Sequence, residues 1–352
     1  MRSYRYQLLL GVASTAIFGF ASMAASQQLG KNLDDIVQLA NKEKNVGVAT
    51  SWEPENLTAL LNGFTQKYPD IKVTLERVSG ISTRERIMNE ALAGIVPYDL
   101  VNVSGELRNQ YIKAGVLHGP IPYQQLFPKI NKLYFSPDGY FAATGFSTYI
   151  IAYNPTLVPK DRVPKKWDDC LDPYWKGKFV ALTRPRTFTA LASAWGEEKS
   201  LAFARALKNN QPVWKRSQSG AVTQMAVGEY PMICGMAYHS MKTVLMRDPT
   251  AKIAYSVPSD LPFQIGEAMG IMKGSKNPNA ALALTGWLVT PEGQKNMHLE
   301  GRSSPFTPGT EAAELVKKNN AKIVFESWDA LMHEAAMARK IIAAWGFPKA
   351  KR

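Results

Sequence analysis

Two arginines and three threonines lie close together in one short stretch, Thr183-Arg-Pro-Arg-Thr-Phe-Thr189. The stretch follows an apolar run that predicts a strand, Phe179 to Leu182, and it precedes a segment that predicts a helix. Guanidinium groups and the backbone N–H groups of a helix N-terminus both bind carboxylates, phosphonates and phosphates. We therefore predict that Arg184, Arg186 and Thr187 bind an oxyanion. The alternative interpretation is a solvated basic turn that is capped by a threonine.

Small hydroxyl and glycine residues follow three successive predicted strands in the N-terminal part of the chain. If these strands are parallel neighbours, their carboxyl ends meet at one edge of a sheet, where open α/β sheets bind ligands. The candidate ligand-binding residues at this edge are Ser51, Trp52, Ser79, Gly80 and Ser104. Trp52 would cover an apolar part of the ligand. Each residue could instead serve only its turn, with Ser51 capping a helix and Trp52 packing in the core.

Two further polar groups occur later in the chain. Ser219 and Gly220 belong to a turn before a predicted helix and are candidates for ligand binding. Tyr238 and His239 directly follow an apolar predicted strand, and a phenol beside an imidazole could contact a polar ligand or a metal. Because the chain has only four histidines, few further ligands of that type exist for a metal. We predict that Tyr238 and His239 line a binding site without a metal, and a mixed Tyr/His metal site is the alternative.

These candidate residues need a scaffold that brings distant segments together. Ser147 to Tyr153 is a β-branched and aromatic run without apolar/polar alternation, which is typical of a strand buried on both faces. A similar short run occurs at Lys252 to Pro258. Two such runs can carry the chain into a second lobe and back. We predict an α/β fold of two lobes, joined by hinge crossover strands near 145–151 and 254–258, with a ligand cleft between the lobes.

The length of 352 residues exceeds what one hydrophobic core normally serves, which also favours two lobes. We place the first lobe at 25–146 plus 258–352 and the second lobe at 147–257. The helical pattern from Glu326 to Ala344 predicts a packed structural helix at the C-terminus. Pro262 to Glu267 indicates a turn that precedes a strand.

The first residues have the features of a secretory signal peptide. Two arginines precede an apolar run from Leu8 to Phe20, and Ser22 and Ala24 are the small residues of a cleavage site. The apolar run is shorter than the roughly 20 residues that a membrane span needs. We therefore predict that residues 1–24 are removed and that the protein is exported. Because the first cysteine is Cys170, we expect a diffusible periplasmic protein without a lipid anchor.

The two cysteines and the net charge restrict the chemistry further. An oxidising compartment would permit Cys170 and Cys234 to pair, but their spacing does not distinguish a disulfide from two separately buried thiols. The formal net charge is +13, and it falls to +11 without Arg2 and Arg5 of the signal peptide. The basic residues are scattered, with no run of five or six. This pattern favours a small anionic ligand over nucleic acid, and we expect no nucleic-acid partner.

Segments from nearly the whole mature chain form an ordered series. They are Ala49-Thr-Ser-Trp52, Phe64-Thr-Gln-Lys-Tyr-Pro-Asp70, Arg77-Val-Ser-Gly80, Tyr98-Asp-Leu-Val-Asn-Val-Ser104, Lys113-Ala-Gly-Val-Leu117, Ala152-Tyr-Asn-Pro155, Trp167-Asp-Asp-Cys-Leu-Asp-Pro-Tyr-Trp-Lys-Gly-Lys178, Val227-Gly-Glu-Tyr-Pro231, Lys276-Asn-Pro-Asn-Ala-Ala-Leu282 and Pro291-Glu-Gly-Gln294. The series resembles bacterial extracellular solute-binding proteins, in particular the branch of ferric-iron, thiamine and phosphonate binders. The resemblance implies a type II periplasmic-binding-protein fold and a receptor that delivers its ligand to the membrane permease of an ABC importer. It also places the loop Gly301-Arg-Ser-Ser-Pro305 near the mouth of the cleft.

The ligand is less clearly indicated than the family. In the ferric-binding branch, two adjacent tyrosines after the strand coordinate iron, and His239 occupies the second position here. This departure favours a small organic acid, phosphonate or phosphate ester over ferric iron. Ferric iron is the alternative, with Tyr238 and His239 as its ligands. We expect a monomer that needs no cofactor.

An enzyme is the remaining class of function. The chain has no Gly-x-Ser-x-Gly, Walker or Gly-x-Gly-x-x-Gly pattern, and the second histidine of a His-Glu-x-x-His site is missing after His333. A Ser-His-carboxylate triad assembled by folding would escape such a search. A secreted hydrolase is therefore kept as a remote alternative, and we expect no enzymatic activity.

Overall fold

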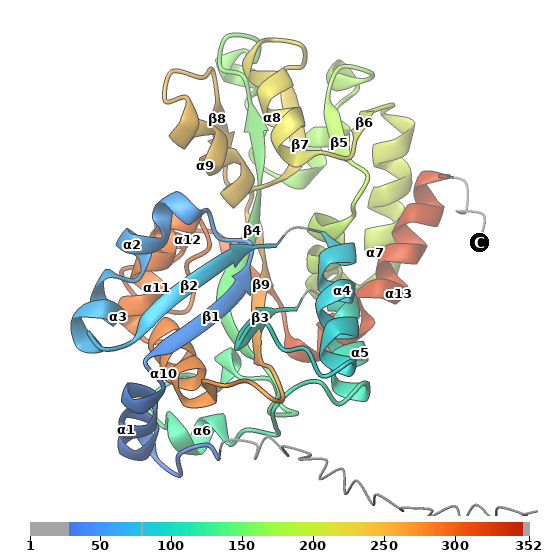
Figure 1. Cartoon of the computed structure of the whole chain (residues 1–352). Helices are drawn as coiled ribbons and strands as arrows, with labels where there is room; N and C mark the ends of the chain where they lie inside the picture. The colour runs from blue at the N-terminus through green and yellow to red at the C-terminus, as the bar shows by residue number, and fades with distance from the viewer. Residues whose placement is uncertain (1–27, 79, 104, 348–352) are drawn as a thin grey trace, which may run out of the picture.

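Helices and strands alternate along the residues that the computed structural model describes, 28–78, 80–103 and 105–347 (Figure 1). The strands are β1 (Asn45–Thr50), β2 (Lys72–Arg77), β3 (Leu100–Asn102), β4 (Ala142–Tyr153), β5 (Val180–Leu182), β6 (Val213–Lys215), β7 (Met232–Ala237), β8 (Ala254–Ser256), β9 (Asp260–Ile271) and β10 (Lys322–Glu326). The predicted signal peptide, residues 1–24, lies outside the described residues.

The helices are mostly short and lie between the strands. The α-helices are α1 (Leu33–Glu43), α2 (Leu57–Leu60), α3 (Asn62–Lys67), α4 (Ile81–Leu92), α5 (Gly105–Lys113), α6 (Tyr123–Leu126), α7 (Arg186–Asn209), α8 (Gln218–Ala226), α9 (Tyr238–Arg247), α10 (Pro278–Leu288), α11 (Pro291–Asn296), α12 (Glu311–Lys318) and α13 (Trp328–Trp345). The 3₁₀ helices are η1 (Pro54–Asn56), η2 (Lys132–Tyr134), η3 (Lys160–Arg162), η4 (Trp167–Leu171), η5 (Pro173–Trp175) and η6 (Met297–Glu300).

Several helices begin where a side chain can satisfy the free N–H groups of the first turn. Asn32, Ser217, Thr310 and Ser327 each accept a hydrogen bond from the backbone N–H three residues later, at the starts of α1, α8, α12 and α13. Such caps stabilise a helix by about 1 kcal/mol each. Of these four helices, α8 and α13 border the site described below.

The strands run in the order β2-β1-β3-β9-β4-β7-β5-β6, with β10 paired to β9 and β8 paired to β4. Strands β1, β2 and β3 are parallel to one another, and β5 is parallel to its neighbours β6 and β7. Strand β4 belongs to both groups, because residues Ala142–Thr148 pair with β9 and residues Tyr149–Tyr153 pair with β7. The predicted first crossover is therefore confirmed as part of β4, which connects the lower and upper lobes in Figure 1.

The return crossover follows β8, at the end of the predicted segment 254–258, and continues directly into β9. The predicted turn at Pro262 to Glu267 is wrong, since these residues lie within β9. Pro262 contributes its carbonyl oxygen, which accepts a hydrogen bond from Thr148 Oγ1 at 3.0 Å. Gly266 lets the two strands approach, because a Cβ atom there would lie 2.4 Å from Ser147 Oγ. Proline and glycine mimic a turn signal but serve the close pairing of β4 with β9.

Apolar side chains gather in two buried clusters. The larger cluster fills the first lobe and continues into α8 and β7. The smaller one surrounds Cys170, Cys234 and Phe188 of the second lobe, and Ile341 and Trp345 of α13 belong to it. In contrast, Trp328 at the start of α13 packs in the larger cluster. The C-terminal helix thus packs on both lobes, beside α5 and along α7 (Figure 1), although the boundaries predicted from the sequence assign it to the first.

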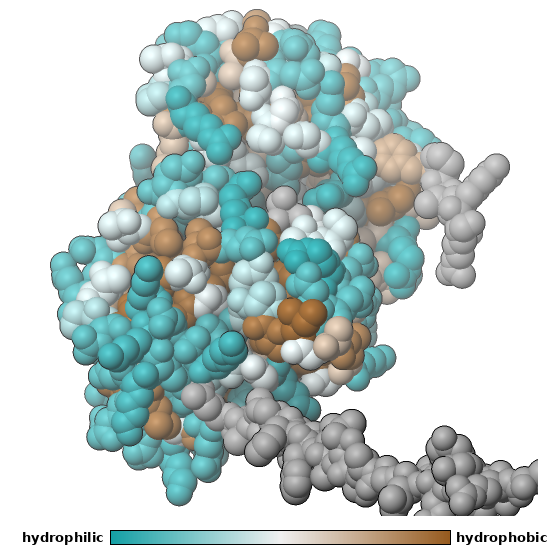
Figure 2. Space-filling model, in the orientation of Figure 1, coloured by the Kyte–Doolittle hydropathy of each residue, from teal (hydrophilic) through white to brown (hydrophobic). Residues whose placement is uncertain are grey.

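The face shown in Figure 2 is mostly hydrophilic, and its apolar residues form separate patches. Within the described part of the chain, no helix is both long and apolar enough to cross a membrane. The apolar residues are instead used in the two buried clusters.

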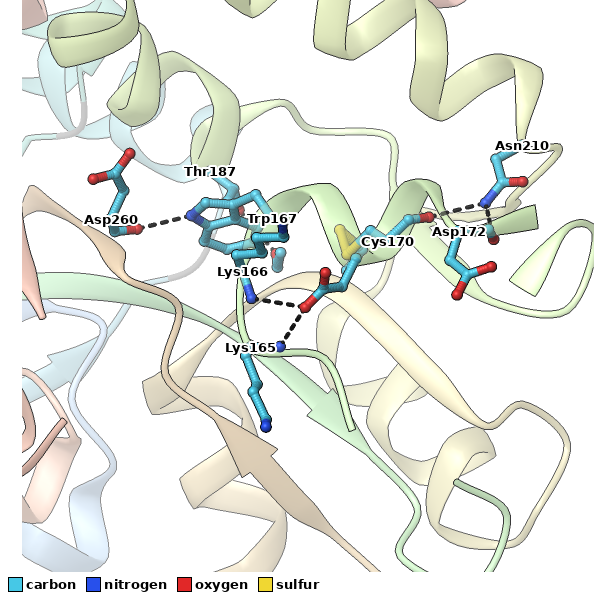
Figure 3. Close-up of a disulfide and its surroundings, with 11 residues drawn as sticks. Lys165, Lys166, Trp167, Cys170, Asp172, Thr187, Asn210 and Asp260 are labelled. Carbon is cyan, nitrogen blue, oxygen red and sulfur yellow. Dashed lines mark hydrogen bonds between the residues drawn. A yellow bond between two sulfur atoms is a disulfide. The ribbon is translucent and has the colours of Figure 1, made fainter. Parts of the chain in front are cut away.

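A disulfide joins Cys170 of η4 to Cys234 of β7, so the question that the sequence left open is answered in favour of pairing. Trp167, on the same 3₁₀ helix, donates its indole N–H to the carbonyl oxygen of Asp260 at 2.8 Å (Figure 3). Trp195 donates its indole N–H to the Asp260 carboxylate, also at 2.8 Å. The disulfide therefore secures a part of the second lobe that holds the first residue of β9.

Removal of this disulfide should destabilise the protein strongly. The cysteines are 64 residues apart, and the chain-entropy model gives about 4 kcal/mol for a loop of that size. We expect Cys170→Ala/Cys234→Ala to lower the free energy of unfolding by about this amount, measured by urea denaturation. Reductant should destabilise the wild-type protein but leave the double variant unchanged, and equal stability of all samples would contradict the prediction.

Helix α9 of the second lobe is tied to the first lobe at two places. Lys242 Nζ lies 2.7 and 2.9 Å from the two carboxylate oxygens of Glu311, and Tyr238 donates its hydroxyl to the same carboxylate at 3.0 Å. At the other end of α9, Arg247 lies 3.5 Å from Glu53. These contacts hold the lobes in the arrangement seen here.

Loss of the Glu311 carboxylate should favour more open arrangements of the lobes. We expect Glu311→Ala to shift the balance by about 1–2 kcal/mol, the range for losing hydrogen bonds to a partly shielded charged group. Small-angle X-ray scattering of the ligand-free protein should show a larger radius of gyration. Glu314→Ala is the matched control, because it removes an acidic residue from the same first turn of α12. An identical radius for all three proteins would contradict the prediction.

Candidate functional site

A cavity of about 510 Å³ lies between the lobes. Its walls come from the turn after β1, from α4, β4, β9, the N-termini of α7, α8 and α9, the loop after η6, and α13. Five residues predicted from the sequence line it: Ser51, Gly80, Arg184, Arg186 and His239. The structure thus brings these five residues, which come from both lobes, together at one cavity.

Four arginines line the cavity, two from each lobe. Arg184 and Arg186 come from the turn between β5 and α7, as predicted. Arg84 of α4 and Arg302 of the loop after η6 are additional. Burial lowers the pKa of the Arg84 guanidinium and Arg186 lowers it further, and burial and Arg186 do the same to Arg184. The guanidinium groups are therefore close enough to repel one another, and an anion in the cavity would relieve that repulsion.

Arg84 is held in place by backbone carbonyls. Its Nε donates to the carbonyl oxygen of Asn102 at 2.8 Å, and a terminal nitrogen donates to that of Gly80 at 2.6 Å. Gly80 lines the cavity and directly precedes α4. The turn at Gly80, which was predicted to bind ligand, thus also positions a cation.

Arg302 is held by a buried carboxylate. Glu267 of β9 is fully buried, and one of its oxygens lies 3.5 Å from Arg302 Nε. The same side chain accepts hydrogen bonds from Ser51 Oγ at 3.2 Å and from Trp52 Nε1 at 2.5 Å. Burial raises the pKa of Glu267, while Arg302 and the two hydrogen bonds lower it.

The expectation that Trp52 covers a ligand is not met by this geometry. Trp52 is 1% exposed and does not line the cavity. Its indole N–H is used by Glu267, so Trp52 lies behind the site and supports the carboxylate that holds Arg302. The alternative interpretation from the sequence, packing in the core, describes it correctly.

Arg186 faces a network of polar side chains at the back of the cavity. Tyr149 of β4 donates its hydroxyl to Gln264 of β9 at 2.8 Å, and Gln264 donates through Nε2 to Glu326 and Glu334. Burial lowers the pKa of Arg186, but Tyr149 and the two glutamates outweigh burial and raise it. The charged form of Arg186 is therefore stabilised before any ligand binds.

Tyr238 and His239 point into different cavities. His239 lines the interlobe cavity, and its Nδ1 is buried without a hydrogen-bond partner among the described residues. Burial lowers the pKa of His239 well below its usual value, and Arg302 and Arg186 lower it further, so the imidazole is neutral. Tyr238 instead lines a cavity of about 550 Å³ with Tyr255 and Glu311. Burial and Glu311 raise its pKa. The expected pairing of the two side chains at one site is not observed.

The other predicted residues have structural roles or lie outside the described chain. Thr187 is 4% exposed and donates its hydroxyl to the carbonyl oxygen of Gly235 at 2.9 Å, which fixes the start of α7 on β7. Ser219 is exposed on α8, and the N–H of Gly220 donates to the capping Ser217 Oγ; neither lines the cavity. Ser79 and Ser104 lie outside the described residues.

Metal-binding residues are scarce in the cavity. Among the described residues, no group of three or more His, Cys, Asp and Glu side chains is placed to hold a metal ion. The arrangement is instead suited to bind an anion through guanidinium groups, hydroxyls and a neutral imidazole.

Sequence reasoning missed Arg84, Arg302, Tyr149, Gln218 and Glu334, which all line the cavity. Arg84 lies one helical turn after the Ser79-Gly80 turn, and Gln218 adjoins the predicted Ser219. The neighbouring predicted residues could therefore have led to both positions. Arg302 lies in the loop that the resemblance placed near the cleft. No local signal identifies Glu334, because it lies within an ordinary amphipathic helix.

Comparisons with known proteins agree with the fold and the cleft. A family model for bacterial extracellular solute-binding proteins matches residues 59–323. The chain belongs to this family. Solute-binding proteins of this family serve ABC importers by delivering a ligand to a membrane permease, and both family and fold are those of non-enzymatic binding proteins. The predicted family and fold class are thereby confirmed.

Several relatives of this solute-binding protein are named for iron. The Fe(3+)-binding periplasmic protein of Serratia marcescens is 24% identical over 294 residues, which cover 81% of this chain and 80% of the relative. Iron-bound HitA from Pseudomonas aeruginosa has a TM-score of 0.65 at 19% identity, covering 86% of this chain and 99% of that one. A Trichodesmium protein, IdiA or FutA, in complex with iron and citrate has a TM-score of 0.65 at 18% identity, covering 85% and 99%. At these identities the two structures show the shared two-lobed fold.

The buried carboxyl of Glu326 gives this solute-binding protein a specific pH dependence. Burial and then Glu334 raise the pKa of Glu326 from 4.5 to about 8. Between these values the folded protein holds a proton that the unfolded chain has released, so stability falls as the pH rises through this window. Glu326→Gln should flatten that decline in urea denaturation between pH 5 and pH 8. Glu314→Gln, an exposed control, should retain the wild-type slope, and an unchanged slope for Glu326→Gln would contradict the prediction.

Proposed function

We propose that the protein is the periplasmic receptor of an ABC importer for ferric iron that arrives in an anionic complex with a small carboxylate. The observation that carries this proposal is the cavity itself, in which two arginines from each lobe converge. The names of the relatives support iron, and the four guanidinium groups support an anion.

Ferric iron is a hard cation that prefers several anionic oxygen ligands. Among the described residues, the cavity offers no group of acidic and histidine side chains that could supply them. A carboxylate complex brings its own oxygens and can retain a negative charge. Planar guanidinium groups bind carboxylates in pairs of parallel hydrogen bonds, so such a complex fits the cations of this cavity.

The size of the cavity agrees with a molecular ligand. Its volume of about 510 Å³ lies within the range of about 300–1,000 Å³ that is common for small-molecule sites. A bare ion would leave most of that space to water. One structural neighbour holds both iron and citrate, which supports a ligand of this kind.

The remaining expectations complete the proposal. Residues 1–24 would act as a cleavable signal peptide, and the mature protein would be a monomer without a lipid anchor or enzymatic activity. Its lobes, 25–146 plus 258–352 and 147–257, would close on the ligand by bending where β4 and the start of β9 connect them. The closed receptor would then be recognised by the permease of its importer.

A second candidate is an iron-free anion, such as an organic acid, a phosphonate or a phosphate ester. The same four arginines favour it, because no described group in the cavity requires a metal. It differs from the first candidate in the ligand alone, and the experiment below separates the two.

Isothermal titration calorimetry of the metal-free protein tests the proposal with three ligands: ferric citrate, citrate and methylphosphonate. We expect ferric citrate to bind more tightly than either iron-free anion. If an iron-free anion binds tightly and iron does not increase the affinity, the second candidate is supported. Binding of ferric iron in the absence of any carboxylate, if Tyr238→Phe abolished it, would contradict both candidates. The reason is that Tyr238 lies in a different cavity.

The role of the arginines can be tested at Arg184. This exposed side chain has no hydrogen bond to another side chain in the described part of the chain, so its removal should disturb the fold little. We expect Arg184→Gln to weaken ferric citrate binding by about 1.5–3 kcal/mol, or roughly ten- to hundredfold in Kd. Arg205→Gln is the control, since Arg205 is exposed on α7 outside the cavity. Equal affinities of the two variants would argue against the arginine site.

A further inference from the structure

One side chain does not fit a cavity that binds anions only. Glu334 is the sole acidic residue among the described residues that line the cavity with the four arginines. It lies on α13, where Glu334, Ala338 and Ile342 form one face, a turn apart, that closes one side of the cavity. A carboxylate in this wall repels every anionic ligand, so its presence needs an explanation.

The carboxylate of Glu334 is fixed from two sides. One oxygen, Oε1, accepts a hydrogen bond from Gln264 Nε2 at 2.9 Å. The other oxygen, Oε2, packs against Gly105 at the start of α5, where a Cβ atom would lie only 2.4 Å away. A larger residue at position 105 would require this oxygen to move. The hydrogen bond from Gln264 and the contact with Gly105 thus define the position of this carboxylate at the edge of the cavity.

Charge balance is the simplest explanation for Glu334, because it faces Arg186 and Arg108. A second explanation is recognition of the ligand. A fixed carboxylate beside guanidinium groups accepts a hydrogen bond from any donor that the bound anion carries near its own carboxylate. The two explanations differ in their consequences: charge balance affects all anions alike, whereas recognition affects only those with a donor.

We propose that Glu334 is a specificity-determining residue, which accepts a hydrogen bond from a hydroxyl or ammonium group of the ligand. The cavity then selects small carboxylates that carry such a donor over those that lack it. This inference rests on the proposed function, because it describes the anion that enters the arginine-lined cavity.

Malate and succinate provide a matched pair of probes, since they differ by one hydroxyl group. The affinities of both for the metal-free protein are measured by isothermal titration calorimetry. For the wild-type protein we expect malate to bind about ten- to hundredfold more tightly, the range for a hydrogen bond to a charged group. In Glu334→Ala this ratio should fall to about one, and in Glu334→Gln it should be intermediate, because an amide oxygen is an uncharged acceptor.

The ratio of the two affinities separates recognition from a structural role. Glu314→Ala is the control, since Glu314 is exposed on α12 and does not line the cavity, and it should retain the wild-type ratio. If the Glu334 variants change the affinities for malate and succinate by the same factor, so that their ratio is preserved, the inference is overturned in favour of charge balance. If Glu334→Ala does not fold, as judged by circular dichroism, the Glu334→Gln ratio decides alone.

The same titrations distinguish failure of this inference from failure of the proposed function. Ferric citrate that binds while neither malate nor succinate does so would overturn the role of Glu334 and leave the receptor function intact. If ferric citrate also fails to bind, the proposed function itself is wrong. A wild-type ratio close to one would likewise overturn the inference, whatever the variants show.

Discussion

The antiparallel pairing of β4 with β9 is the interaction on which the rest of the molecule depends. The two strands meet from Ala142 to Thr148, and β4 continues into the second lobe to pair with β7. The residues that support the cavity come from these strands: Ser147 and Tyr149 from β4, and Gln264 and Glu267 from β9. If the register slipped by one residue, each of these side chains would point to the opposite face. The pairing thus builds the connection between the lobes and the floor of the site together.

The site concentrates positive charge that the fold only partly compensates. Glu267 supports Arg302, and Tyr149 with two glutamates supports Arg186, but Arg84 is held by backbone carbonyls alone among the hydrogen bonds described. Four guanidinium groups near one another oppose folding through their repulsion. A bound anion adds the missing counter-charge, and ligand binding to the folded state raises stability by mass action. Relief of the repulsion between the guanidinium groups would therefore contribute to the affinity for an anion.

The sequence predicted what depends on local pattern and missed what depends on long-range geometry. The buried run at Ser147–Tyr153 identified the strand that joins the lobes, and the clustered arginines at 184 and 186 identified a wall of the cavity. Trp52 could not be placed, because its role is set by Glu267, which is 215 residues away. Tyr238 and His239 are adjacent in sequence, yet the start of α9 points them into different cavities. Glu334 was hidden because an amphipathic helix shows which of its faces is buried, but not which polar residue meets the partner lobe.

Helix α13 has a consequence for the order in which the protein can fold. Its last tryptophan, Trp345, is 2% exposed and packs with Phe188 and Trp214 of the second lobe, while Trp328 at its start donates to the carbonyl of Leu133 in the first. Large domains usually fold as units, beginning from the N-terminus during synthesis. Here both hydrophobic cores include side chains of α13, so neither core is complete before this helix has been made. The two lobes therefore cannot reach full stability one after the other, and both cores are completed in the same late step.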